Sequence, residues 1–114
     1  MAYDEELAAR YRSSLNGKQG ISEKRMMGGV CFFHHGNMIG GADRTKKNIR
    51  RFMFRVGKEN EVEALARQGA TIVELGPRRM GGLIFVDEKY CTGDQLGNWI
   101  ELALGFVSTL PPKK

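Results

Sequence analysis

The sequence predicts an α+β domain in which helices pack on a largely antiparallel sheet. Apolar residues recur at helical spacing near both ends of the chain, whereas short runs of β-branched and aromatic residues lie between them. Glycine or polar turns bound most of these runs. The expected order is α-β(3)-α-β(2)-α, and no linker, repeat or low-complexity segment divides the chain. Residues 1–114 are therefore expected to form a single domain.

The two terminal helices have the clearest signals. Asp4 is a suitable N-cap for the first helix, which is expected to end at Asn16-Gly17. Thr92 and Gln95 have the spacing of a capping box at the start of the last helix. The apolar stripe of that helix consists of Leu96, Trp99, Ile100, Ala103, Val107 and Leu110. We expect Trp99, Phe106 and Phe85 to be largely buried.

Five strands are expected between these helices. They cover residues 23–33, 38–42, 52–56, 71–75 and 83–86, with a short helix at 59–67. We interpret Gly28-Gly29 as an irregularity inside the first strand. In the short helix, the expected buried residues are Val62, Leu65 and Ala66.

Composition and charge favour a cytoplasmic protein. The N-terminus has no apolar signal segment, and no apolar run approaches the ~20 residues of a membrane span. The chain has two cysteines, Cys31 and Cys91, fewer than small secreted domains usually carry. Both thiols are therefore expected to be reduced.

The sequence contains no pattern typical of a catalytic centre, so we predict that the protein is not an enzyme. No serine lies in a G-x-S-x-G motif, and no phosphate-binding glycine loop precedes a helix. A thiol enzyme that uses Cys31 or Cys91 with His34 or His35 is a less favoured alternative. These residues lack the two close ligand pairs of a structural zinc site, so no metal and no cofactor are expected.

A basic stretch is the strongest candidate for a functional site. The chain has a formal net charge of +5, and six of its 18 Lys and Arg residues fall between positions 44 and 55. Placed on a loop and the start of the next strand, they could contact successive phosphates of a nucleic acid. The alternative is a solvated hairpin whose charges only maintain solubility. The candidate nucleic-acid-binding residues are Arg44, Lys46, Lys47, Arg50, Arg51 and Arg55.

Several segments together resemble the TfoX N-terminal domain family. They are residues 1–10 (MAYDEELAAR), 23–32 (EKRMMGGVCF), 36–41 (GNMIGG), 54–57 (FRVG), 64–70 (ALARQGA), 80–86 (MGGLIFV) and 96–113. The resemblance covers nearly the whole chain in order. It implies an α-β(3)-α-β(2)-α fold with an antiparallel sheet, and kinship with regulators of competence genes that act on transcription. It carries over no catalytic residue.

The leading hypothesis is a non-enzymatic regulatory or protein-interaction module, linked to transcription or competence through a protein partner. The alternative is weak, non-specific binding of nucleic acid by the basic stretch. A homodimer is also expected, because small regulatory modules commonly form twofold dimers. Strand edges and a last helix that is apolar over more than one face would both need covering.

Overall fold

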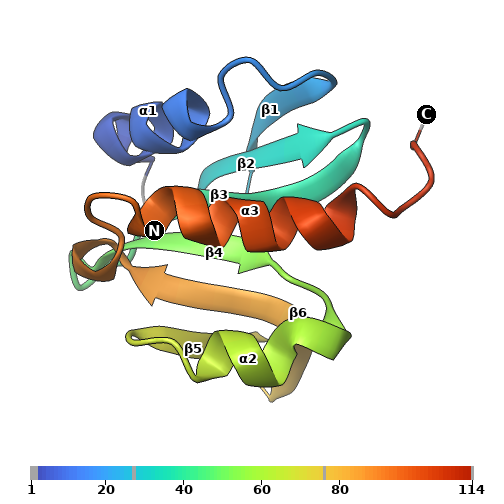
Figure 1. The fold of residues 1–114 in the computed structure, drawn as a ribbon. Helices are drawn as coiled ribbons and strands as arrows, with labels where there is room; N and C mark the ends of the chain where they lie inside the picture. Colours follow the sequence, from blue (N-terminus) through green and yellow to red (C-terminus); the bar gives the residue numbers. More distant parts are fainter. Residues whose placement is uncertain (1–2, 27, 76, 114) are drawn as a thin grey trace.

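The chain folds into one antiparallel sheet with its helices on one face, as the computed structural model shows (Figure 1). The model describes residues 3–26, 28–75 and 77–113. Its helices are α1 (Glu5–Ser14), α2 (Glu61–Leu65) and α3 (Gln95–Val107), with 3-10 turns at Lys58–Asn60 and Glu88–Tyr90. Its strands are β1 (Ile21–Met26), β2 (Gly29–His34), β3 (Asn37–Arg44), β4 (Arg50–Arg55), β5 (Ala70–Leu75) and β6 (Arg78–Asp87). None of these helices is long and apolar enough to cross a membrane.

The α+β class with an antiparallel sheet is confirmed, but the prediction of five strands is wrong. The described residues form six strands in the order β1-β2-β3-β4-β6-β5. The expected strand at residues 23–33 is a hairpin, in which Lys24 pairs with Cys31 and Ile21 with His34. Gly28 has a φ of 77°, a conformation that glycine adopts without strain, so the chain reverses here instead of continuing.

Local signals position the terminal helices as expected. The Asp4 carboxylate accepts a hydrogen bond from the Leu7 backbone N–H at 3.1 Å and caps α1. The Gln95 side chain reaches back and accepts from the Thr92 N–H at 3.1 Å, as in a capping box. In α2 the expected buried face is only partly right: Leu65 packs against the core, but Val62 is 83% exposed, Ala66 is exposed, and Ala64 is buried instead. A helix of five residues is too short for its spacing to define one face.

A single apolar core joins the three helices to one face of the sheet. Tyr11 of α1 stacks on Phe32 with ring centroids 4.7 Å apart, and Trp99 of α3 stacks on Phe54 at 5.2 Å. Trp99 is only 3% exposed, as predicted, while Phe106 and Phe85 are half-buried. Most of the apolar surface of α3 is therefore buried within the chain. The need to cover α3 no longer supports a dimer, and the homodimer stays a prediction.

The helices approach the sheet most closely at β3. The Tyr11 hydroxyl donates to the Met53 carbonyl at 3.1 Å, directly beside Gly40. A Cβ at Gly40 would lie 1.9 Å from that carbonyl oxygen and 2.5 Å from the Tyr11 hydroxyl. Only glycine therefore lets α1 reach β3 with this hydrogen bond in place.

We predict that Gly40→Ala will lower the free energy of unfolding by about 3 kcal/mol or more, because backbone and a buried tyrosine must shift to make room. The control is Gly105→Ala, which adds the same methyl group to α3 where nothing lies within 4 Å. That variant should be as stable as the parent or gain up to about 1 kcal/mol. Urea unfolding compares them, and equal stability of the two variants would contradict this packing.

Candidate binding site on the helix-free face of the sheet

The second face of the sheet carries its own apolar cluster, to which no described helix contributes. Side chains alternate between the two faces along each strand. Residues that point away from the helices include Cys31, Met53 and Val73, all of which are buried. Five half-buried residues pack against them: Phe33, Met38, Met80, Leu83 and Phe85.

This face is hollowed into a pocket of about 370 Å³. All six strands contribute to its lining, from Met26 on β1 to Val73 and Glu74 on β5. Residues near the tips of the β1–β2 and β5–β6 hairpins, such as Gly29 and Met80, line the same pocket, so the sheet is curved around it. The volume lies in the range of roughly 300–1,000 Å³ that is typical of small-molecule sites.

Gly41 leaves room in the floor of the pocket. It pairs with Cys31 on one side and Met53 on the other, so these three residues share a face of the sheet. A Cβ at Gly41 would lie 2.2 Å from the Val30 carbonyl oxygen. Because no side chain fits there, backbone forms the floor between the two sulfur-containing side chains.

Sulfur-containing side chains make up a third of the lining residues. Cys31 and four methionines, at positions 26, 38, 53 and 80, line the pocket. Methionine is unbranched and polarisable, and adapts readily to ligands of different shape. Burial raises the pKa of the Cys31 thiol, and the negative charge of Asp43 raises it further. The thiol is therefore held in its neutral form and contributes apolar surface.

One end of the pocket is polar. Arg51 donates to both carboxylate oxygens of Asp43, from Nε to Oδ1 at 2.8 Å and from Nη2 to Oδ2 at 3.2 Å. Its guanidinium lies 3.6 Å from the centroid of the Phe85 ring. Both charged residues line the pocket. The apolar cavity thus ends in a fixed ion pair.

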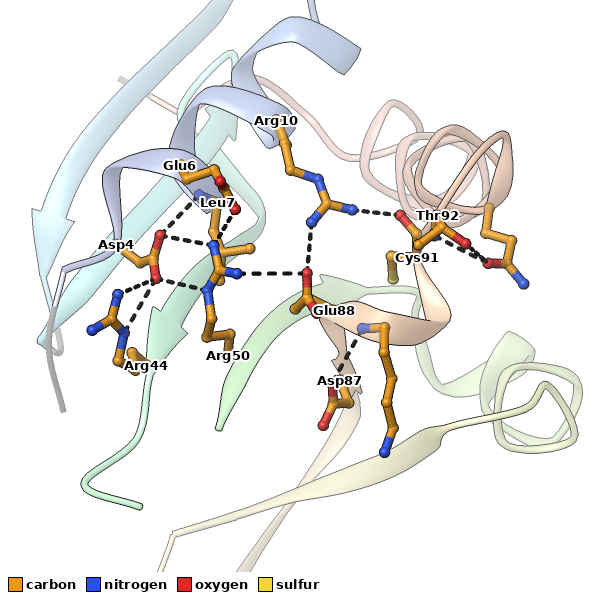
Figure 2. Close-up of polar contacts among 12 residues, drawn as sticks. Asp4, Glu6, Leu7, Arg10, Arg44, Arg50, Asp87, Glu88, Cys91 and Thr92 are labelled. Atoms are coloured by element: carbon orange, nitrogen blue, oxygen red, sulfur yellow. Dashed lines mark hydrogen bonds and ion pairs between the residues drawn. The ribbon is translucent and has the colours of Figure 1, made fainter. Parts of the chain in front are cut away.

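The structure divides the six basic residues of the predicted nucleic-acid site among different environments. Arg44 and Arg50 both bind Asp4, with shortest distances of 2.8 and 3.0 Å (Figure 2). Arg50 also contacts Glu6 and lies 3.8 Å from Glu88. The remaining residues are Arg51, which lies in the pocket, Arg55, which lies 5.6 Å from the Phe106 ring, and Lys46 and Lys47, which are exposed.

The loop within the basic stretch is shorter than the expected strand bounds of 38–42 and 52–56 imply. Strand β3 continues to Arg44 and β4 begins at Arg50, so the connection covers residues 45–49. The Thr45 hydroxyl accepts from the Ile49 N–H at 3.1 Å, and Asn48 adopts a φ of 62°. This turn leaves Lys46 and Lys47 as the two exposed candidates of the set.

The ion pairs around Asp4 connect the N-terminus to distant parts of the chain (Figure 2). Arg10 of α1 donates to Glu88 at 2.9 Å and to the Cys91 carbonyl at 2.7 Å, just before α3. Burial alone would raise the pKa of Asp4, but hydrogen bonds from Arg50 and Arg44 hold it well below its usual range. Arg44 and Arg50 therefore act as structural partners of a buried carboxylate.

The thiols and histidines considered for catalysis are dispersed. Cys31 lies on the helix-free face, whereas Cys91 belongs to the core under the helices. Burial raises the pKa of Cys91 to about 12. The rings of His34 and His35 lie edge to face, 4.4 Å apart. Within residues 3–26, 28–75 and 77–113, no group of three His, Cys, Asp or Glu side chains is placed to hold a metal.

Sequence reasoning missed this pocket, although a signal was present. The segments Val30–Phe33, Phe52–Phe54 and Leu83–Val86 are continuously apolar rather than alternating. Such runs are typical of strands covered on both faces. Helices cover one face of this sheet, and the continuous runs reveal that the other face is apolar as well.

Comparisons with known proteins returned no match: no family model, no curated protein and no solved structure matches this chain. The resemblance to the TfoX N-terminal domain family therefore stays a prediction from the segments quoted above.

Asp4→Asn should lower the free energy of unfolding at neutral pH by about 3 kcal/mol, because two arginines lose their shared carboxylate. The depressed pKa in the folded state means that Asp4 contributes its full stabilisation above about pH 5 and loses it as the pH falls towards 2. The variant should therefore lose less stability than the parent on acidification.

Urea unfolding at pH 7 and pH 3 measures both effects. Glu63→Gln is the control, because this carboxylate is exposed and lies as far as 4.0 Å from its partner Arg67. The control variant should change the free energy of unfolding by less than about 0.5 kcal/mol. The same destabilisation by Asp4→Asn at both pH values would show that the carboxylate charge is unimportant.

Proposed function

We propose that this chain is a non-enzymatic regulatory module that works by binding, and that its binding surface is the apolar, helix-free face of the sheet. The observation that carries the proposal is the pocket of about 370 Å³ on that face, lined mainly by methionine, aromatic and aliphatic side chains. Its charged lining residues are Asp43 and Arg51, which already form an ion pair within the chain, and Glu74, which is exposed. These groups suit recognition of an apolar group better than bond-breaking chemistry.

The energetics of the face support this proposal. Phe33, Met38 and Leu83 keep part of their apolar surface in contact with water. Covering apolar surface is favourable by about 25 cal/mol per Å². Contiguous exposed apolar patches on soluble proteins commonly mark interaction sites. A ligand on this face would therefore gain affinity from surface that the fold itself leaves uncovered.

The dye bis-ANS, which fluoresces in apolar environments, should bind the folded protein on this face. Met38→Glu places a negative charge in the pocket lining and should weaken dye binding about tenfold or more, because the carboxylate would lose water and would repel the sulfonate groups of the dye. Fluorescence titration under native conditions measures the affinity.

Val62→Glu is the matched control, since it introduces the same side chain at a position on α2 that is 83% exposed. This variant should bind the dye as the parent does. Absence of dye binding by the parent, or an equal loss in both variants, would argue against the proposed binding face.

Weak nucleic-acid binding is a second candidate, which the placement of Lys46 and Lys47 favours. Both are exposed on the turn between β3 and β4. Arg44, Arg50 and Arg51 are less available, because each binds a carboxylate of this chain. A protein partner, whether a transcription regulator or a second copy of this chain, is a further possibility that the family resemblance motivates.

If the turn binds duplex DNA, the logarithm of the affinity should fall with log salt with a slope of about −2, since two lysines neutralise two phosphates at about −0.9 each. A slope of −4 to −5, expected roughly for five contacts, would require the paired arginines to open. Lys46→Ala with Lys47→Ala should remove the salt dependence, whereas Lys24→Ala with Lys89→Ala should preserve it. Unchanged binding in the first double variant would exclude this turn as the contact.

A further inference from the structure

We propose that the pocket on the helix-free face binds a small free organic acid with an apolar body. This proposal rests on the proposed function and names the class of ligand. The carboxylate would lie against Arg51 and the body among the methionines. Four features of the pocket favour this ligand: its volume, its lining, its polar end and its concave shape.

The volume limits the size of the ligand. A pocket of about 370 Å³ holds about a dozen non-hydrogen atoms, taking the ~30 Å³ that one water molecule occupies in the liquid as a measure. A saturated acid such as decanoate has this size. A polypeptide segment with several ordered residues is larger than the cavity.

The lining favours a flexible apolar body over one particular shape. Met38, Met53 and Met80 present thioethers that adjust to the ligand, and Phe85 and Leu83 add fixed apolar surface. Gly41 removes a side chain from the floor between Cys31 and Met53. These residues give no hydrogen bond that would specify a polar body.

The polar end favours an acceptor at the head of the ligand. Both carboxylate oxygens of Asp43 already accept from Arg51. Among the hydrogen bonds of the described residues, Arg51 uses two of its five N–H groups, both of them on Asp43. The remaining N–H groups of Arg51 are donors that a carboxylate can satisfy. The other charged lining residue, Glu74, pairs with Arg79 at the opposite end of β6 from Asp87, the strand partner of Arg51, so it lies away from this end of the pocket.

The concave shape favours a small ligand over a second copy of the chain. The hairpin tips that carry Met26 and Met80 both border the pocket, so the face is a hollow and not a flat surface. Two hollow faces related by a twofold axis would leave space between them, whereas stable interfaces are packed as densely as protein interiors.

Isothermal titration calorimetry with decanoate, below its micelle concentration, tests this inference. Decanoate should bind with one site per chain. Decanol, which carries the same body, should bind about tenfold more weakly, because a charge-assisted hydrogen bond is worth that factor or more. Decyltrimethylammonium should bind more weakly still.

Two variants assign the body and the head of the ligand to their places. Leu83→Trp fills the pocket and should reduce decanoate affinity about tenfold or more, while Val62→Trp on α2 should not change it. The double variant Asp43→Asn with Arg51→Gln replaces the ion pair by a neutral pair. It should still bind decanol, and should lose the preference for decanoate over decanol.

The outcomes separate this inference from the proposed function. If bis-ANS binds the face but decanoate does not, the small-acid ligand is wrong and the binding face stands. If neither binds, both proposals fail. Equal affinity for decanoate and decyltrimethylammonium overturns the role of Arg51. Sedimentation of the protein with phosphatidylglycerol vesicles would show that it binds a lipid surface, and would overturn the proposal that the ligand is a free organic acid.

Discussion

The close approach of α1 to β3 determines the layout of the molecule. Tyr11 is fully buried, and its hydroxyl reaches the Met53 carbonyl across Gly40. This contact commits one face of the central strands to the helices, and the stacked Trp99 and Phe54 extend the same layer towards α3. The ion pairs of Asp4 hold the start of α1 against β3 and β4 from outside this core. With the helices fixed on one face, no described helix covers the apolar cluster on the other face.

The same strands supply apolar residues to both faces. On β4, Phe52 and Phe54 point into the core under the helices, whereas Met53 lies in the cluster on the opposite face. A sheet covered on one side usually alternates apolar and polar residues. The strands that line the pocket carry apolar residues on both faces instead. The ion pair of Asp43 and Arg51 lies at one end of the pocket. The proposed binding surface is therefore formed by the strands themselves.

Local chemistry allowed much of the fold to be predicted from the sequence. The Asp4 cap, the Gln95 capping box and the buried Trp99 all depend on residues near one another in the chain. The hairpin at Gly28 was missed because a strand with a bulge and two paired strands have the same apolar pattern. The pairing of Arg44 and Arg50 with Asp4 spans 40 and 46 residues, so the basic stretch looked available for phosphates when only the sequence was considered. The pocket depends on the curvature of the whole sheet, which no single segment specifies.

The central claim is that a small acid lies on the helix-free face of the sheet. Nuclear Overhauser effects between unlabelled decanoate and methyl-labelled methionines test the claim most directly. The account predicts contacts from the ligand chain to the methyl groups of Met38, Met53 and Met80, with the carboxylate end nearest Arg51. Ligand contacts confined to residues of the helical face, such as Leu102 beside Trp99, would contradict it.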